Sequence, residues 1–572
     1  MTRILFFVHY NKYDGLADYV LYLLKHIKTI YSRVVFISNS PISDEQQDKL
    51  AGLYDSIIVR ENKGFDFGAW KYALLKEGWD NLAQYDSVTL MNDSCFGPIF
   101  DLTQVYTKME QQDIDFWGLT NHRHTKHGMH GTRRPIPEHI QSYFLCFNKN
   151  VVTSQTFQKF WIKVKYESNI KKIIEQYETQ LTPRLAETGF KHTVFFDANH
   201  FPNIYNDIPF YHPDLCINNN IPFIKLKSLL DFKLPQYIIK LIKENTNYPV
   251  SLIYEHMIDI YDPNTTLFIE NKLIPAQLDA QLTISSQKIA VHLHVFYLDI
   301  FEKYIAYFDN YPDELDLFFT TNTEEKKTYI QNYMQNHASA NRVKDIIIIE
   351  NKGRDIFPWL SIAHHLNTYD IVGHFYTKKS LAADDEWIGI TWQQDIFDSL
   401  LHPIAAIIET FRAKEEIGII IPEIPRYFRT SIALHFFDEK RLQNLMQAIW
   451  KKMSCKKTID FCKLVTAIMP CGNMFWYRPA ALQPLFNLKL SAVDIPTEPI
   501  PPDGTILHAI ERIMVYVAWN EGYDYRIMVP QTPNITGFMD NILLNTVKTS
   551  RTYKTGEYIL ALPLIIKKQF KK

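Results

Sequence analysis

The stretch Glu61-Asn62-Lys63-Gly64-Phe65-Asp66-Phe67-Gly68-Ala69-Trp70 occurs almost twice in this chain. Its second copy is Glu350-Asn351-Lys352-Gly353-Arg354-Asp355-Ile356-Phe357-Pro358-Trp359, about half the chain further on. Each copy follows a run rich in β-branched residues, Ser56–Val59 in the first and Ile346–Ile349 in the second, and such runs are typical of buried strands. A motif that recurs at the same place after a strand predicts two related domains.

The similarity between the two halves extends well beyond this motif. Ile4–Asp14 aligns with Ile289–Asp299 without a gap, and each segment is a strand-like run that leads into an amphipathic helix. A second strand then ends at an asparagine, Asn39 in the first half and Asn322 in the second. Because strands that alternate with helices favour a parallel sheet, we expect an α/β fold with two tandem Rossmann-like domains.

The extent of the repeat predicts the domain boundaries. We expect the first domain at residues 1–230, a helical connector at 231–285 and the second domain at 286–545. The remaining segment, 546–572, combines an apolar run with a basic end. Such a segment can lie in an anionic bilayer interface, so we expect this tail to contact a membrane surface. The alternative is a packed terminal strand with a solvated end.

Composition narrows the class of protein. The net charge is −2 over 572 residues, which argues against a nucleic-acid partner. The six cysteines show no Cys-x-x-Cys spacing, which fits a reducing compartment and provides no thiolate metal site. The chain opens on a strand-like run rather than a signal peptide, and it contains no run of about 18 apolar residues. We therefore expect a cytoplasmic protein that does not span a membrane.

The repeated motif lies where α/β folds bind nucleotides, at the carboxyl ends of parallel strands. Gly64 and Gly68 would let the backbone approach a ligand closely. Asp66 and its counterpart Asp355 could accept hydrogen bonds from sugar hydroxyls, whereas the alternative role for either is a helix N-cap. We expect six residues of the motif to bind the donor substrate, together with the strand-end asparagines Asn39 and Asn322. The six motif residues are Asn62, Gly64, Asp66, Asn351, Gly353 and Asp355.

A strand-end acid distinguishes the first half. Asp93, in Asn92-Asp93-Ser94, could bind Mg²⁺ or Mn²⁺ and so neutralise a diphosphate leaving group; the alternative is a polar turn. The second half has no acid there, and Lys378 and Lys379 could face a diphosphate directly. We therefore expect a metal in the first domain and none in the second.

A third element pairs an acid with an arginine. Glu178 lies six residues before Arg184 and eleven before Gly189, and Glu511 lies eleven before Gly522. Such an acid could accept the proton of an attacking sugar hydroxyl, and Arg184 would assist at the donor. The alternative is a surface glutamate on a solvated helix. The second half has Val517 where Arg184 stands.

Four aromatic side chains are candidates for the wall of an acceptor site, because aromatic faces stack on sugar rings. Core packing explains each of them equally well. They are Tyr143, Trp392, Phe475 and Trp476.

Taken together, these residues resemble the inverting GT-A glycosyltransferases. In that family the acid six residues before the arginine is the catalytic base, which corresponds to Glu178 here. The family's Asp-x-Asp metal motif falls near Asn92-Asp93-Ser94, where one acid is missing. The resemblance implies two GT-A-like domains.

Several motifs more specifically resemble the rhamnan synthesis protein F family, which builds rhamnose-rich cell-wall polysaccharides of streptococci and relatives. They are Glu-Asn-Lys-Gly-x-Asp, Tyr376-Thr377-Lys378-Lys379-Ser380, Cys471–Arg478 and His508–Arg512. The resemblance implies a dTDP-β-L-rhamnose donor, inversion at the anomeric carbon, and a rhamnan acceptor on a polyprenyl diphosphate lipid. It also implies work with other polysaccharide-assembly enzymes at the inner face of the cytoplasmic membrane.

The differences between the halves leave three possibilities open. Both domains could be active and make two linkages. One could be active while the other holds acceptor or braces its partner. The chain could also be a non-catalytic carbohydrate-binding scaffold of the same pathway.

Overall fold

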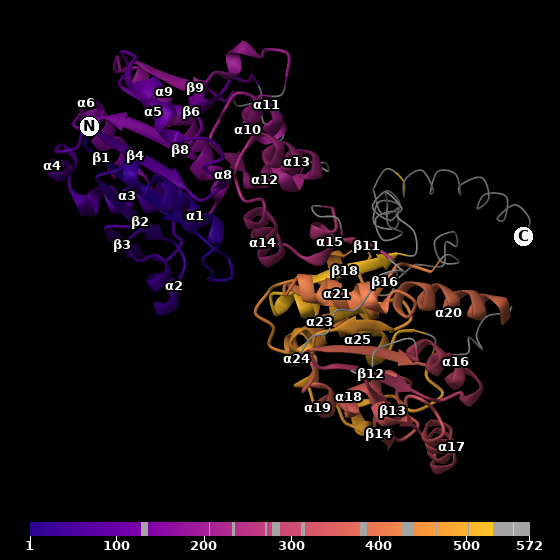
Figure 1. Cartoon of the computed structure of the whole chain (residues 1–572). Coiled ribbons are helices and arrows are strands. Elements are labelled where there is room, and N and C mark those ends of the chain that lie inside the picture. The colour runs from indigo at the N-terminus through magenta and orange to yellow at the C-terminus, as the bar shows by residue number, and fades with distance from the viewer. Residues whose placement is uncertain are drawn as a thin grey trace, which may run out of the picture. The chain divides into compact units, whose positions relative to one another are not determined.

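The computed structural model describes residues 1–126, 135–204, 206–231, 235–268, 272–276, 287–309, 315–377, 386–425, 440–464, 466–501, 503–529 and 553. The chain forms two compact units. The first unit is Met1–Ile260 with Phe268–Glu270, and the second is Tyr261–Leu267 with Asn271–Lys572. Strands and helices alternate in both (Figure 1), which confirms the predicted α/β class.

The sheet of the first unit is mostly parallel. Its strands run in the order β3 (Ser56–Val59), β2 (Arg33–Ser38), β1 (Arg3–His9), β4 (Ser87–Asn92), β8 (Phe144–Asn148), β6 (Phe116–His122), and both β7 (His139–Ile140) and β9 (His192–Phe196) pair with β6. β8 is antiparallel to both β4 and β6. Every residue of β4 is buried, as expected for a central strand covered on both faces.

The sheet of the second unit follows the same order. Its strands are β14 (Val343–Ile348), β13 (Leu315–Thr321), β12 (Ile289–His294), β15 (Ile371–Tyr376), β17 (Phe475–Tyr477), β16 (Ile417–Pro422), β18 (Asp524–Val529) and β11 (Leu273–Pro275). β17 is antiparallel between β15 and β16, as β8 is between β4 and β6. This shared order makes positions in the two units comparable strand by strand.

Amphipathic helices cover these sheets with their apolar faces. In α1, for example, the buried residues Tyr19, Val20, Leu23, Leu24 and Ile27 recur at helical spacing. The first unit contains α1 (Asp18–Ile27), α2 (Asp44–Lys49), α3 (Phe65–Glu77), α4 (Trp79–Leu82), α5 (Leu102–Glu110), α6 (Lys149–Val152), α7 (Gln155–Lys163), α8 (Ile170–Ile173), α9 (Thr179–Ala186), α10 (Ile208–Tyr211), α11 (Pro213–Asn218), α12 (Leu226–Asp231), α13 (Pro235–Asn245) and α14 (Ser251–Ile260). It also has the short strands β5 (Cys95–Phe96) and β10 (Ile224–Lys225).

The second unit contains α15 (Pro263–Thr266), α16 (Leu298–Phe308), α17 (Glu324–Gln335), α18 (Ile356–Ser361), α19 (Ala363–Leu366), α20 (Glu386–Leu400), α21 (Ile404–Ala413), α23 (Lys440–Lys452), α24 (Gln483–Phe486) and α25 (Ile506–Asn520). Among the described residues, no helix is both long and apolar enough to cross a bilayer. The tail 546–572 lies outside the described residues except for Tyr553.

The stretch between the sheets is divided between the two units. α13 and α14 belong to the first unit, because their apolar faces pack onto α11 and α1. β11 extends the second sheet by pairing with β18. Just before β11, buried Lys272 contacts Asp524 at 2.8 Å, and Arg526 contacts the same carboxylate.

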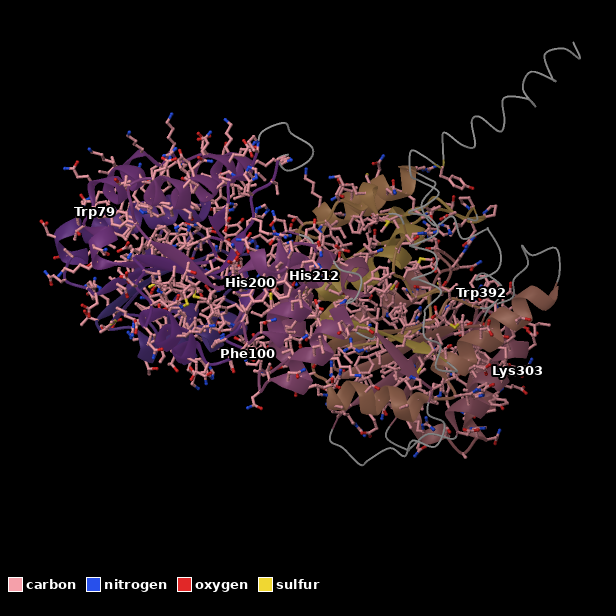
Figure 2. All side chains as sticks on the ribbon, turned by 90° about the horizontal axis from the view of Figure 1, so that it is seen from above. Trp79, Phe100, His200, His212, Lys303 and Trp392 are labelled. Carbon is pink, nitrogen blue, oxygen red and sulfur yellow. The ribbon has the colours of Figure 1, made fainter. Side chains whose placement is uncertain are left out.

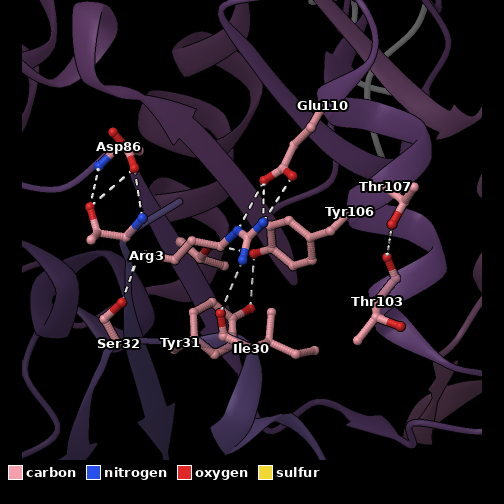
Figure 3. A network of polar contacts seen from close by, with 11 residues as sticks. Arg3, Ile30, Tyr31, Ser32, Asp86, Thr103, Tyr106, Thr107 and Glu110 are labelled. Atoms are coloured by element: carbon pink, nitrogen blue, oxygen red, sulfur yellow. Dashed lines mark hydrogen bonds and ion pairs between the residues drawn. The ribbon is translucent and has the colours of Figure 1, made fainter.

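A polar network ties the amino ends of the first sheet to α5 (Figure 3). Arg3 Nη2 donates to Glu110 Oε1 at 2.7 Å, and its guanidinium lies 4.8 Å from the ring centre of Tyr106. Tyr106 and Tyr31 share a hydrogen bond of 3.0 Å. Because the repeated motif follows the carboxyl end of β3, this network braces the end of the sheet opposite the motif.

Candidate functional site

The two copies of the motif share a left-handed turn at the same two positions. Gly64 and Phe65 have φ angles of 76° and 52°, and Gly353 and Arg354 have 70° and 53°. Two consecutive left-handed residues turn each chain sharply into α3 or α18. Asp355 occupies the N-cap position of α18 without making a cap hydrogen bond, and the partner of Asp66 is a side chain outside α3. These contacts disfavour the alternative role of both aspartates as helix caps.

The motif glycines pack closely against neighbouring residues on the side where a Cβ atom would lie. A Cβ atom on Gly64 would lie 3.1 Å from Tyr166 Cα, and one on Gly68 would lie 2.3 Å from the Lys63 carbonyl oxygen. A Cβ atom on Gly353 would lie 2.6 Å from that of Phe357. The space beside each glycine is therefore already occupied by neighbouring residues.

The first unit brings Asp66, in the first turn of α3, close to Asp93, which follows β4. Asn92 Nδ2 donates to Asp66 Oδ2 at 2.7 Å, and the backbone N–H of Tyr10 donates to Asp93 Oδ2 at 2.8 Å. Loss of solvent raises the pKa of Asp66 to about 6. It also raises the pKa of Asp93 to about 8, helped by the charge of Asp66. The two carboxylates are thus close enough to repel each other.

Glu178 joins this acid cluster. Its Oε1 accepts hydrogen bonds from the backbone N–H and the hydroxyl of Ser142, at 3.2 and 2.8 Å, just before β8. Glu178 is the last residue of a single π-helical turn, Ile174–Glu178, that leads into α9. Such turns insert one extra residue into a helix and recur at functional sites. The charge of Glu178 contributes to the raised pKa of Asp66, so the structure brings Asp66, Asp93 and Glu178 together.

Two lysines that the sequence pattern did not predict, Lys225 and Lys227, face this cluster. β10 pairs with β5, directly after Asp93, and so returns Lys225 and Lys227 to the strand ends. Lys225 Nζ lies 3.4 Å from Asp207 Oδ1, and the charges of Asp207 and Glu178 raise its pKa against the effect of burial. Lys227 opposes the rise in the pKa of Asp66. No local pattern distinguishes these lysines from solvated ones, because only the chain reversal places them here.

The strand-end asparagines are each held by a cation. Asn39 Oδ1 accepts from Arg60 Nη1 at 2.5 Å, and Asn322 Oδ1 accepts from Lys326 Nζ at 2.8 Å. Asn62 Oδ1 is buried without a hydrogen-bond partner among the described residues. Asn351, its counterpart in the second unit, is exposed.

The second unit builds a similar site from different residues. Asn473 Nδ2 donates to Asp355 Oδ2, which is the role that Asn92 has in the first unit. Glu511, within α25, accepts the backbone N–H of Gly472 at 3.3 Å, just before β17. Both predicted bases are therefore held by the turn before the antiparallel strand. Burial raises the pKa of Tyr376, and the charges of Asp355 and Glu511 raise it further, so the three groups lie close together.

Tyr376, rather than a lysine, occupies the position of Asp93. The hydroxyl of Tyr19 donates to the Asp93 carbonyl at 2.6 Å, and the hydroxyl of Tyr304 donates to the Tyr376 carbonyl at 2.8 Å. Lys378 and Lys379, which were expected to replace Asp93, lie outside the described residues.

The predicted acceptor aromatics are mostly core residues, which corrects that expectation. Phe475 and Trp476 are fully buried and Tyr143 is 4% exposed, so their ring faces are covered by protein. Trp392 of α20, marked in Figure 2, is partly exposed, and its indole lies beside Gly472, which holds Glu511. Trp392 is thus the member of this set that lies beside a candidate site.

Arg184 lies apart from the acid cluster. Its side chain is exposed, and its guanidinium lies 5.5 Å from the ring centre of Phe160 in α7. Among the described residues, no hydrogen bond or ion pair joins Arg184 to Asp66, Asp93 or Glu178.

The first unit offers a reason to bind a cation. Asp66 and Asp93 lie close together with raised pKa values, and a divalent ion would relieve their repulsion. Two carboxylates are few for such a site, and the described residues contain no group of three or more His, Cys, Asp or Glu arranged to hold a metal. The donor set thus suits an ion shared with a bound diphosphate.

The chain belongs to the family described as rhamnan synthesis protein F, whose model matches residues 34–523. This confirms the family resemblance drawn from the sequence. Its similarity to individual curated proteins is partial. Over 270 residues it is 27% identical to the uncharacterized protein WxcX of Xanthomonas campestris pv. campestris (strain B100). This match covers 45% of this chain and 35% of that protein. Over 176 residues it is 26% identical to the uncharacterized protein y4gN of Sinorhizobium fredii, which covers 31% of this chain and 44% of that one.

Solved structures resemble the chain only weakly. The glycosyltransferase GlyE of Streptococcus pneumoniae TIGR4 is 10% identical with a TM-score of 0.24, and the match covers 64% of this chain and 84% of that one. The mannosyltransferase PcManGT of Pyrobaculum calidifontis, in complex with GDP-Man and Mn²⁺, is 11% identical with a TM-score of 0.23, covering 53% and 69%. TM-scores this low do not establish a shared fold.

Proposed function

We propose that the chain is an inverting glycosyltransferase of bacterial polysaccharide synthesis with two GT-A-like units. It transfers L-rhamnose from dTDP-β-L-rhamnose to a rhamnan acceptor on a polyprenyl diphosphate lipid, at the inner face of the cytoplasmic membrane. Family membership supports the pathway. The observation that carries the reaction class is the pair Glu178 and Glu511, each only partly buried, held by the turn before the antiparallel strand and close to the motif aspartate.

The chemistry follows from this arrangement. Inversion needs the acceptor hydroxyl to attack the anomeric carbon from the face opposite the leaving diphosphate. Glu178 or Glu511 accepts the proton of that hydroxyl as the new bond forms. Asp66 and Asp355 accept hydrogen bonds from donor hydroxyls and so orient the sugar. In the first unit, Lys225 and Lys227 contribute positive charge near the departing diphosphate.

Among the described residues, we assign a place for a divalent cation to the first unit alone. Asp93, with Asp66, would hold Mg²⁺ or Mn²⁺, which neutralises diphosphate charge when bound. In the second unit Tyr376 stands at the position of Asp93 and provides no carboxylate. We infer that each unit makes its own linkage. The competing possibility is that only one unit transfers sugar while the other holds acceptor.

Turnover of a defined substrate pair tests this function. The full chain, supplied with dTDP-β-L-rhamnose and a lipid-linked primer, should release dTDP and lengthen the glycan. The double variant Glu178→Gln/Glu511→Gln should lose about 10²–10⁴ of the rate with its fold intact. The matched control is Glu187→Gln, an exposed glutamate just beyond α9. Unchanged turnover in the double variant would contradict the assignment of both bases, and a wild-type chain without turnover would favour a carbohydrate-binding scaffold.

A further inference from the structure

A chain of buried hydrogen bonds runs through the second unit and ends at the motif. His294 Nδ1 lies 2.9 Å from Thr320 Oγ1, which lies 2.8 Å from His292 Nε2. His292 Nδ1 lies 3.0 Å from His374 Nδ1, and His374 Nε2 lies 3.5 Å from Asp355 Oδ2. All five residues are at most 6% exposed. Side chains of β12, β13 and β15 are thus connected through hydrogen bonds to the Asp355 carboxylate.

The protons of this chain follow from counting donors and acceptors. Burial lowers the pKa of all three histidines, that of His294 to about 4, so each ring carries one proton. If Asp355 is ionised, His374 Nε2–H must donate to it. His374 Nδ1 then accepts from His292, His292 Nε2 accepts from the Thr320 hydroxyl, and Thr320 accepts from His294 Nδ1–H. The reverse arrangement would leave a bare ring nitrogen facing the carboxylate, so the charge of Asp355 fixes the direction of every bond.

Asn473 adds a second, independent observation. Because Asp355 Oδ2 is an acceptor, Asn473 must turn its Nδ2 towards it, which leaves its Oδ1 facing elsewhere. That Oδ1 is buried and has no hydrogen-bond partner among the described residues, although Asn473 is only 3% exposed. Asn473 also has a φ of 52°, which a residue other than glycine adopts at a cost. A buried acceptor without a partner destabilises the fold unless a ligand satisfies it.

The first unit shows that the fold does not require this series of hydrogen bonds. Strand pairing sets Phe7 beside Met91 where the second unit sets His292 beside His374. Both pairs are buried at equivalent places, since Met91 pairs with Phe144 as His374 pairs with Phe475. An apolar pair therefore fills this position well, so packing alone does not account for the two histidines.

We propose that Asp355 and Asn473 form a site in the second unit that accepts hydrogen bonds from two hydroxyl groups of the transferred sugar, with His374 and His292 as positioning residues. Asp355 Oδ2 receives both side-chain contacts described above, and we assign Oδ1 to the ligand. The hydroxyls belong to the sugar because Asn473 directly follows Gly472, which holds the proposed base Glu511. This inference rests on the proposed function.

Binding of two probes tests the site. In the full chain carrying Asp66→Asn to weaken the first unit, we would measure calorimetric affinity for dTDP-β-L-rhamnose and for dTDP. Asn473→Gly, which suits the positive φ, and His292→Phe/His374→Met, which installs the pair of the first unit, should each weaken sugar-nucleotide binding about 10–100-fold. Neither should change dTDP binding. His337→Met, which removes a His–Asp contact of 3.1 Å at the far end of α17, is the matched control.

The outcomes separate the two proposals. Asp355→Asn should weaken binding similarly, and adding the histidine pair variant to it should have little further effect, since both act through one carboxylate. Unchanged affinity in Asn473→Gly, or an equal loss for dTDP, would overturn the sugar-hydroxyl site alone. A wild-type chain that binds neither probe would overturn both proposals. Nitrogen-15 NMR gives a readout that needs no ligand: a His374 ring protonated at Nδ1 instead of Nε2 would contradict the positioning role.

Discussion

The two units share a strand order and a motif backbone, yet they surround the motif aspartate differently. Asp66 lies in a partly exposed cluster of acids faced by two lysines, and its pKa is raised. Asp355 is buried beside a histidine and an amide, and contact with His374 lowers its pKa against the effect of burial. One backbone therefore supports two electrostatic environments. The comparison teaches that a duplicated site keeps its geometry more readily than its charge.

Replacing each proposed base separately should give the largest effect, because it separates the activities of the two units. We expect Glu178→Gln and Glu511→Gln each to lower the rate at which one linkage forms by about 10²–10⁴-fold. The rate for the other linkage should not change. Linkage analysis of the product by NMR would show this. If one variant abolishes all transfer and the other changes nothing, the chain has a single active unit and the comparison becomes one of enzyme and binding module.

Breaking the buried ion cluster should unfold the second unit selectively. Asp524→Asn removes the buried carboxylate that Lys272 and Arg526 both contact, and should cost about 3–5 kcal/mol of the unfolding free energy of the second unit. Urea unfolding followed by hydrogen exchange would assign the loss. Glu45→Gln, which removes an exposed ion pair with Lys49, is the control and should leave the midpoint unchanged.

The same carboxylate gives a pH dependence with a defined sign. The charge of Lys272 is the main influence that lowers the pKa of Asp524 from 3.8 to about 2, although burial opposes it. Its contribution to stability is therefore fully present above pH 4 and is lost as the pH falls through about 2. Unfolding of the second unit measured between these pH values should show this loss in the wild type and not in Asp524→Asn.

Metal removal should separate the units. With EDTA we expect the rate at which the first unit forms its linkage to fall at least about tenfold. A bound cation stabilises the charge of the leaving diphosphate by several kcal/mol. The linkage made by the second unit should persist. Mg²⁺ or Mn²⁺ should restore the first, and full activity of both units in EDTA would refute the Asp93 site.

Alanine at the motif glycines should give the smallest effects. Gly64→Ala and Gly353→Ala both force a left-handed alanine, at a cost of roughly 1–2 kcal/mol. Gly353→Ala should cost more, because its Cβ would lie 2.6 Å from that of Phe357. Gly52→Ala shares the positive φ but faces open space, and should therefore be the mildest. Equal losses in all three would mean that the close packing is relieved by small shifts.

Local patterns predicted what depends on neighbours along the chain. The strand Ser56–Val59 lies where the sequence placed it, because β-branched residues and a following turn mark it. The partners of the motif aspartates could not be predicted in this way. Asn92 ends β4 whereas Asn473 precedes β17, so two positions that do not correspond in sequence perform one role. Phe475 and Trp476 were misjudged because an aromatic side chain has the same sequence pattern in a core as in a binding site.

The strand β11 has a practical consequence for anyone dividing this protein. It covers the open edge of β18, and its hydrogen bonds come from residues that precede the first strand of the duplicated order. A second unit expressed from Ile289 onwards would expose an unpaired backbone edge, and such edges template association with other chains. It should form oligomers visible by light scattering, whereas a fragment beginning before Lys272 should remain monodisperse.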